Sequence, residues 1–126
     1  MKNERAFFKC THCGKVAGVV TDGGGKLICC GEEMGLLQAN TTDAAQEKHV
    51  PVAVREGNTL KVQVGSVAHP MTAEHHIAWI AIAQGNKTQR VALAETGEPK
   101  AEFTIEDGAV TVYEYCNLHG LWATEA

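Results

Sequence analysis

The four cysteines near the start of the sequence constrain its fold more than any other feature. Cys10 and Cys13 are separated by two residues, and the adjacent pair Cys29 and Cys30 follows after fifteen more. A CxxC loop places two sulfurs on one side of a metal ion, and a second pair across a short hairpin completes a tetrahedron. Adjacent cysteines can share one ion only where the backbone turns sharply, and Gly31 directly after the pair permits such a turn. The spacing therefore predicts a metal ion held by four thiolates.

The segment that contains these cysteines, residues 1–37, is too small to fold by hydrophobic burial alone. Its apolar pieces are short and comprise residues 6–8, 16–20 and 27–28. So small a unit usually needs a metal ion or disulfides, and an odd total of five cysteines fits disulfides poorly. We expect a separate module stabilised by zinc or iron, between which the spacing does not choose. His12 is expected to face solvent, because four thiolates already complete the coordination shell.

The overall composition narrows the functional classes. The chain of 126 residues carries a net charge of −4 and has no basic stripe, so we expect no nucleic-acid partner. The longest unbroken apolar run, residues 77–83, is far shorter than the roughly 20 residues that cross a bilayer, so we expect no membrane span. The first ten residues lack the apolar core of a secretory signal. These features favour the cytoplasm, where grouped cysteines stay reduced and bind metal.

The sequence after the cysteine module predicts a linker and then an antiparallel β-sandwich. Residues 38–48 are polar and are interpreted as a linker with one helical turn. Residues 49–126 contain short alternating segments separated by turn signals such as Gly85-Asn86 and Asp107-Gly108. Several such segments at short spacing are typical of a sandwich. The expected strands span residues 50–56, 59–66, 76–84, 87–94, 101–106 and 109–116.

Histidines and the fifth cysteine gather at strand ends and loops of the predicted sandwich. His49 lies at the entry to the first strand, His69 and His75 flank a loop, and Cys116 and His119 share one turn. Loops at the rim of a sandwich can bring such side chains to one point. Imidazole suits iron, copper, zinc or nickel, and a single thiolate favours a redox role. A blue-copper site and a zinc hydrolase site both fit this donor set less well.

The ordered motifs resemble those of the desulfoferrodoxin family, the two-iron superoxide reductases. They are KCTHCG with LICC, EKHVPV, AHPMTAEHHIAW and EYCNLHG, and together they extend over essentially the whole chain. The resemblance implies a mainly β fold, with a desulforedoxin-like N-terminal module and an immunoglobulin-like antiparallel β-sandwich. It also implies two iron ions per chain. Their ligands would be Cys10, Cys13, Cys29 and Cys30 for the first ion, and equatorial His49, His69, His75 and His119 with axial Cys116 for the second.

The resemblance further implies one-electron reduction of superoxide to hydrogen peroxide, with a rubredoxin-like electron donor and a homodimeric assembly. The lysine and glutamate of the family's site correspond to Lys48 and Glu47. Lys48 would attract the superoxide anion, and Glu47 would bind the second iron once it is ferric. His76 is not a ligand in the family pattern. Glu114 is expected to face solvent, and a role beside Cys116 is the less favoured interpretation.

Two other functional classes compete with the enzyme. In one, the iron sites only carry electrons, although an open coordination position opposes a pure electron carrier. In the other, the chain is a zinc-stabilised binding module with incidental histidines. That backbone N–H groups of residues 117–119 point back at the Cys116 sulfur and tune its potential is a hypothesis for the structure to test.

Overall fold

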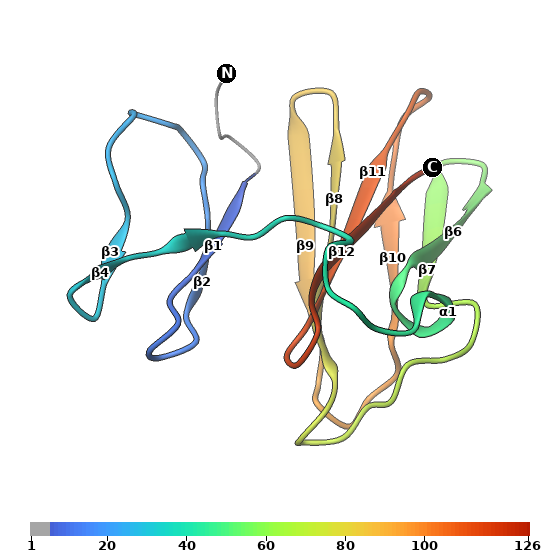
Figure 1. Ribbon diagram of the computed structural model, residues 1–126. Coiled ribbons are helices and arrows are strands. Elements are labelled where there is room, and N and C mark those ends of the chain that lie inside the picture. The colour runs from blue at the N-terminus through green and yellow to red at the C-terminus, as the bar shows by residue number, and fades with distance from the viewer. Residues whose placement is uncertain (1–5) are drawn as a thin grey trace. The chain divides into compact units, whose positions relative to one another are not determined.

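The chain forms two compact units in a computed structural model that describes residues 6–126 (Figure 1). The first unit extends to Gln38 and the second begins at Ala39. The first five residues of the predicted cysteine module lie outside the described part of the chain. Each unit is described by itself below.

The first unit consists of short strands with almost no hydrophobic core. Among its described residues, the buried hydrophobic side chains are those of Cys10 and Met34, whereas Val20 and Ile28 are largely exposed. Its strands therefore gain little from burial. They form a sheet in the order β2-β1-β5 and a separate hairpin β3-β4. Their bounds are β1 Phe7–Lys9, β2 Val16–Gly18, β3 Ile28–Cys29, β4 Glu32–Glu33 and β5 Gly35–Leu36.

The backbone turns sharply at the adjacent cysteine pair, which confirms the prediction from Gly31. The hairpin β3-β4 reverses over Cys30 and Gly31, whose φ angles are 53° and 76°. A two-residue hairpin loop with both residues at positive φ matches the right-handed twist of its strands. The turn keeps the sulfurs of Cys29 and Cys30 within 4.0 Å of each other, although the two residues are neighbours.

The second unit is a sandwich of two antiparallel sheets preceded by one helical turn, α1 Gln46–His49. One sheet has the order β10-β7-β6 and the other β12-β11-β8-β9. The strands are β6 Pro51–Glu56, β7 Thr59–Val64, β8 Ile77–Gln84, β9 Lys87–Ala92, β10 Lys100–Thr104, β11 Thr111–Cys116 and β12 Gly120–Glu125. No helix within residues 6–126 has the length and apolar character required to span a membrane.

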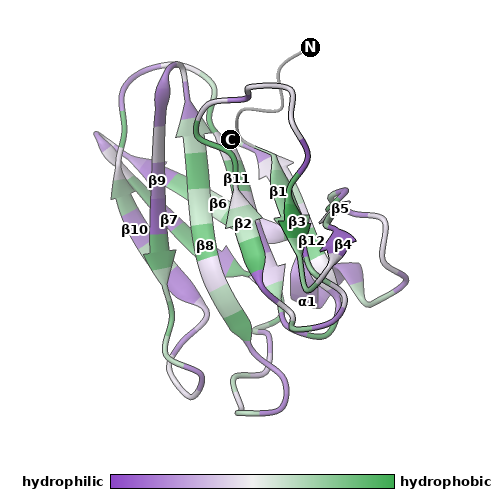
Figure 2. Cartoon of the chain, turned by 90° about the vertical axis from the view of Figure 1, so that its left-hand side faces the viewer, coloured by the Kyte–Doolittle hydropathy of each residue, from purple (hydrophilic) through white to green (hydrophobic). Residues whose placement is uncertain are grey.

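The core of the sandwich lies between the inner faces of its two sheets. Leu60 and Val62 of β7 pack there with Ile80 and Ile82 of β8 and Val112 of β11. The central strand β8 is mostly hydrophobic, whereas the edge strand β9 is largely hydrophilic and exposed along its length (Figure 2). The predicted mainly β fold with an antiparallel sandwich is therefore confirmed.

The six predicted strands correspond to β6 through β11, with boundaries that differ by a few residues. The sequence analysis missed β12. This strand pairs with β11 over its whole length and begins at Gly120, whose φ is 79°. Because β12 follows β11 after a turn of only three residues, Cys116 lies directly opposite Gly120. The missed strand thus completes the hairpin that carries Cys116 and His119.

Candidate metal centres

The four cysteines of the first unit converge on one point. Their sulfur atoms all lie within 4.8 Å of one another, and the Cys13 and Cys29 sulfurs are 3.6 Å apart. A tetrahedral ion with metal–sulfur bonds of about 2.3 Å places its sulfurs about 3.8 Å apart. The arrangement therefore fits a single metal ion. His12 stays outside it, is exposed as predicted, and pairs with Glu32 at 3.0 Å.

Charge in this cluster also favours a bound cation. The backbone N–H of Cys13 donates to the Cys10 sulfur, and this bond is the main reason that the pKa of Cys10 falls to about 6. Contacts with the Cys10, Cys13 and Cys29 sulfurs raise the pKa of Cys30 to about 12. One thiolate therefore forms readily at neutral pH, whereas further thiolates beside it need a positive charge among them.

Strand pairing explains how a second cluster forms at one end of the sandwich. The start of β6 pairs with the end of β7, where Pro51 lies opposite Val64. The start of β8 pairs with the end of β11, where Ile77 lies opposite Cys116. The same end carries the segments just before β6, after β7, before β8 and before β12. These segments hold His49, His69, His75 and His119, respectively.

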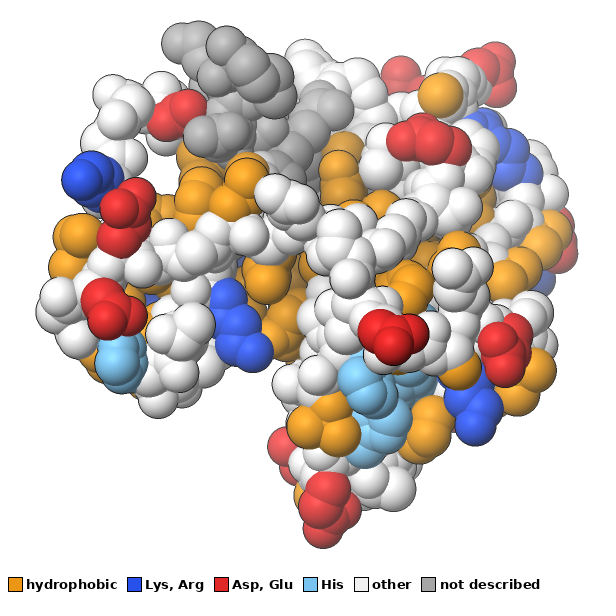
Figure 3. All heavy atoms as spheres, in the orientation of Figure 1, with side chains coloured by type: hydrophobic (Ala, Val, Ile, Leu, Met, Phe, Trp, Pro, Cys, Tyr) orange, Lys and Arg blue, Asp and Glu red, His pale blue; other side chains and the backbone are white. Residues whose placement is uncertain are grey.

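The side chains of this second cluster meet at short distances. The Nε2 atom of His49 lies 3.1 Å from Nε2 of His69 and 3.1 Å from Nδ1 of His119. The Cys116 sulfur lies 3.5 Å from Nε2 of His69 and 3.9 Å from Nδ1 of His119. The donor atoms of His49, His75, Cys116 and His119 all lie within 4.8 Å of one another. In Figure 3 a group of histidine side chains reaches the surface of the sandwich.

The four imidazole rings are arranged around a common centre. In the order His49, His69, His75, His119, neighbouring ring centroids are 4.5–5.0 Å apart with interplanar angles of 78–86°. His49 and His75 are farther apart, at 6.3 Å, and are nearly parallel at 30°. They therefore face each other across the centre, which leaves His69 and His119 as the other opposed pair.

The hydrogen bonds of the rings leave unshared electron pairs directed at this centre. Nδ1 of His49 donates to the Ala45 carbonyl at 2.8 Å, and Nδ1 of His69 donates to the Pro70 carbonyl at 2.7 Å. A neutral imidazole has one N–H, so both Nε2 atoms carry lone pairs, 3.1 Å apart. Nε2 of His75 is buried and has no hydrogen-bond partner among the described residues.

These features fit a transition metal. Burial lowers the pKa of His69 to about 4 and also lowers the pKa values of His49 and His75, so the rings are neutral at pH 7. Lone pairs that face each other repel unless a cation lies between them. Metal–nitrogen bonds of about 2.1 Å place adjacent ligand nitrogens about 3.0 Å apart, which agrees with the observed 3.1 Å.

The Cys116 thiol is fully buried, and the turn that follows it acts on its pKa. Burial raises its pKa, while the backbone N–H groups of Leu118 and His119 act in the opposite direction by stabilising the thiolate. The prediction that this turn points its N–H groups at the sulfur stays a prediction for Leu118 and His119, whose effect on the pKa agrees with it. It is wrong for Asn117, whose N–H donates to the His76 carbonyl at 3.2 Å.

Lys48 and Glu47 lie on α1 directly before His49, and both are exposed. The backbone of this turn is held by the loop after β7, since the Glu47 carbonyl accepts a hydrogen bond from the Val67 N–H at 2.9 Å. Burial is the main cause of the lowered pKa of His75, the neighbouring histidines follow, and the Lys48 ammonium makes the smallest contribution. The positive charge of Lys48 therefore acts on the His75 imidazole.

Glu114 corrects the sequence analysis, which expected it to face solvent. Its side chain is fully buried on the inner face of the sheet, and burial raises its pKa to about 9. Both carboxyl oxygens are without hydrogen-bond partners within residues 6–126. The signal was present in the sequence, because a strand that buries Val112 and Cys116 must bury Glu114 between them.

Trp122 of the missed strand β12 contacts two of the clustered histidines. Its ring stacks on His49, with centroids 5.1 Å apart, and its Nε1 donates to the His119 carbonyl at 3.1 Å. Without β12, the sequence offered no reason to place this tryptophan beside the site. His76, predicted not to be a ligand, donates from Nδ1 to the Thr72 carbonyl at 2.9 Å.

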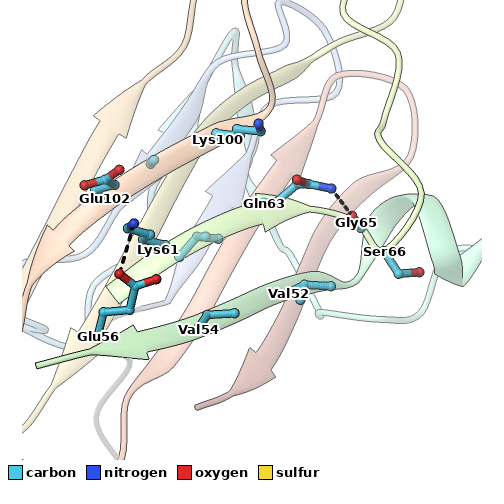
Figure 4. Close-up of a pocket in the computed structure, with 11 residues that line it drawn as sticks. Val52, Val54, Glu56, Lys61, Gln63, Gly65, Ser66, Lys100 and Glu102 are labelled. Atoms are coloured by element: carbon cyan, nitrogen blue, oxygen red, sulfur yellow. Dashed lines mark hydrogen bonds and ion pairs between the residues drawn. The ribbon is translucent and has the colours of Figure 1, made fainter. Parts of the chain in front are cut away.

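A groove on the outer face of β6, β7 and β10 is a separate feature (Figure 4). Two of its charged side chains, Lys61 and Glu56, form an ion pair at 3.1 Å. Among the described residues, no histidine or cysteine lines it. One end of the groove, at Gly65 and Ser66, lies beside α1. The groove therefore contacts the segment that carries His49 through the Ser66–Glu47 hydrogen bond.

Gly65→Ala is expected to disturb the second cluster through the backbone of α1. A Cβ atom at Gly65 would lie 2.6 Å from the Glu47 carbonyl oxygen and 3.0 Å from the Lys48 carbonyl carbon. Such overpacking costs about 1–3 kcal/mol of unfolding free energy, and it displaces His49. Urea unfolding followed by tryptophan fluorescence, with metal analysis, measures both effects. Gly97→Ala is the control, since its Cβ meets neighbours at 3.4 Å. Equal stability and metal content of the two variants would contradict this prediction.

Comparison with known proteins identifies the family. The profile of the family described as Desulfoferrodoxin matches residues 41–125, and that of the Desulfoferrodoxin N-terminal domain matches residues 2–37. The desulfoferrodoxin of Nitratidesulfovibrio vulgaris is 47% identical over 126 residues, covering 100% of both chains. A desulfoferrodoxin homolog of Archaeoglobus fulgidus is 50% identical, covering 91% of this chain and 92% of its own. The crystal structure of the superoxide reductase from Treponema pallidum superposes with a TM-score of 0.76 at 37% identity, covering 94% and 97% of the two chains. The chain therefore belongs to the desulfoferrodoxin family.

Proposed function

We propose that this chain is a superoxide reductase: superoxide, one electron and two protons give hydrogen peroxide, and no dioxygen is released. One observation carries the proposal. Four imidazoles and one thiol, which come from segments far apart in the sequence, direct their donor atoms at one point near the surface. The similarity to the Treponema pallidum superoxide reductase supports the same activity.

The second cluster would hold a mononuclear iron ion, with His49, His69, His75 and His119 around it and Cys116 on one side. Iron bound there supplies the electron and an open coordination position for superoxide. The neutral imidazoles add no charge, so Cys116 is the one anionic ligand. The N–H groups of Leu118 and His119 would favour the thiolate form of its sulfur against the burial that raises its pKa. The first cluster would hold a second iron ion on Cys10, Cys13, Cys29 and Cys30.

Lys48 and Glu47 would act on the substrate side of the site. The net charge of −4 gives superoxide no general attraction to the chain, so a local cation must supply it. Lys48 attracts the anion and orders the water that delivers protons. Glu47, exposed on the same helical turn as His49, would offer a carboxylate ligand suited to a ferric ion.

The source of electrons and the assembly state complete the proposal. Each turnover consumes one electron, so a small one-electron carrier of the rubredoxin type would return the iron to its ferrous state. We also propose a homodimer and a cytoplasmic location. The five cysteines, all within the described residues, are free thiols, which suits a reducing compartment.

Metal analysis together with visible absorption tests this assignment. Two irons per chain and strong absorption from ferric thiolate are expected, and azide should bind rapidly to the oxidised second site through its open position. Two zincs per chain, which give no visible absorption, would refute the assignment. A two-iron chain that binds no azide or cyanide would instead be an electron carrier with closed coordination shells.

Lys48→Ala is expected to slow the reaction with superoxide about 10-fold at low ionic strength, because local positive charge raises the encounter rate of an anion. The dependence of the rate on salt should also become flatter. Pulse radiolysis over a range of ionic strengths measures both quantities. Lys61→Ala is the matched control, since it removes the same charge where Lys61 is already paired with Glu56. If Lys48→Ala and Lys61→Ala give the same rates and salt dependence, Lys48 has no part in the mechanism.

A further inference from the structure

The side chain of Asn117 connects two segments that carry ligands of the second cluster. Its Oδ1 accepts a hydrogen bond from the His76 N–H at 2.9 Å, and its Nδ2 donates to the Glu74 carbonyl at 2.9 Å. Its own backbone N–H donates to the His76 carbonyl at 3.2 Å. Asn117 therefore holds the backbone on both sides of His75, and it is itself bonded covalently to Cys116.

His75 depends on this support more than the buried histidines His49 and His69 do. The rings of His49 and His69 are oriented by hydrogen bonds from Nδ1 to backbone carbonyls. Within residues 6–126, no hydrogen bond orients the ring of His75. Thr72 does bond the His75 backbone, through Oγ1 and its own N–H. Those bonds connect residues of one loop, so they set the conformation of the loop but not its position relative to Cys116.

We propose that Asn117 is a positioning residue, whose side-chain amide sets the placement of the His75 imidazole relative to the Cys116 thiolate and thereby the retention of metal at the second site. The inference rests on the proposed function only for the identity of the metal. The physical reason is preorganisation, because ligands held at the right separation before binding lose less freedom when the ion enters. Residues that orient metal ligands typically contribute 10- to 100-fold to affinity.

Asn117→Ala removes both side-chain bonds. It adds no backbone strain, because among the described non-glycine residues only Cys30 and Asn40 have a positive φ. Asn40 provides a control with the same kind of side-chain clamp, and its φ of 63° means that its substitution also adds backbone strain. Its Oδ1 accepts from the Ala123 N–H at 2.9 Å, its Nδ2 donates to the Ala123 carbonyl at 3.1 Å, and its N–H donates to the Leu121 carbonyl at 3.0 Å. Asn40→Ala thus breaks an equivalent clamp on β12 that touches no ligand residue.

The experiment measures loss of iron to a chelator from wild type, Asn117→Ala and Asn40→Ala. The four-cysteine site is an internal reference in each protein. The chain has two tryptophans, Trp79 and Trp122, both in the sandwich, so urea unfolding followed by fluorescence reports the stability of that unit. We expect Asn117→Ala to lose iron from the second site about 10- to 100-fold faster, with a shifted thiolate absorption band. Asn40→Ala should keep the wild-type rate of iron loss and the wild-type absorption band, even if it lowers the unfolding free energy as much as Asn117→Ala or more.

Unchanged iron loss and an unchanged band in folded Asn117→Ala would overturn the proposal, as would an equal effect of Asn40→Ala. If Asn117→Ala does not fold, Asn117→Asp takes its place, because it keeps the acceptor for the His76 N–H and loses the donor to Glu74. It should show an intermediate rate of iron loss, and a wild-type rate would overturn the proposal. None of these measurements uses superoxide. A wild-type chain that binds iron but fails to reduce superoxide would refute the proposed function and leave this inference standing.

Discussion

Cys116→Ser is expected to lower the rate of superoxide reduction by at least about 100-fold. Removing a residue that only supports a metal ligand already lowers metal affinity or activity roughly 10- to 100-fold, and this variant removes the ligand itself. The buried sulfur is the one anionic donor among the second cluster, and it lies 3.5 Å from Nε2 of His69. A serine hydroxyl at the same position is smaller and stays protonated at neutral pH. Visible absorption should lose the thiolate band of the second site, and pulse radiolysis should give the residual rate.

Cys13→Ser is the companion variant, since it changes a sulfur of the first cluster instead. It should remove the absorption of the four-cysteine site and leave the band of the second site in place. The direct reaction of superoxide with the reduced protein should continue. If Cys116→Ser retains the wild-type rate, the thiolate has no part in the reaction, whatever happens to the spectrum.

Removal of metal from the four-cysteine site is expected to unfold the first unit while the sandwich stays folded. The described part of that unit buries little beyond Cys10 and Met34, which contributes only about 3 kcal/mol. A structural metal ion supplies on the order of 10 kcal/mol or more. The sandwich has its own core, formed by residues such as Leu60 and Ile80. The free energy of unfolding of the first unit therefore depends on its ion.

Cys10→Ala makes this loss permanent, and amide hydrogen exchange measures the result unit by unit. Protection should disappear from β1 and β2, while the amides of β8 and β11 exchange as slowly as in wild type. Unfolding of the sandwich, followed by tryptophan fluorescence, should keep its midpoint. Persistent protection of β1 and β2 in the variant would contradict the account of how this unit is stabilised.

The turn that forms the first cluster could be predicted from local sequence signals, whereas the ligands of the second cluster were expected from the family resemblance. The Cys29-Cys30-Gly31 stretch indicates a sharp turn because only such a turn brings adjacent sulfurs together, and the turn is present. Alternating residues such as Leu60 and Val62 predicted strands that bury one face, and they lie in the core. Such signals depend on neighbours along the chain, which a sequence displays directly.

The features that the sequence did not reveal depend on contacts between distant segments. Trp122 contacts His49 across the site, and Asn117 bonds to residues 41 and 43 positions before it. Neither contact follows from a local pattern. Glu114 is a different case, because strand alternation would have placed it beside Cys116 on the buried face. The charge of Glu114 argued for an exposed position, but the side chain is buried, as the alternation of the strand predicts.

The yield of hydrogen peroxide per superoxide tests the central claim most directly. Fully reduced protein, in excess over superoxide, is mixed with it in the absence of any donor, and peroxide, dioxygen and oxidised iron are measured together. The account predicts one peroxide and one oxidised second-site iron for every superoxide consumed, without dioxygen. One peroxide for every two superoxide anions, with dioxygen released, would show dismutation and would contradict it.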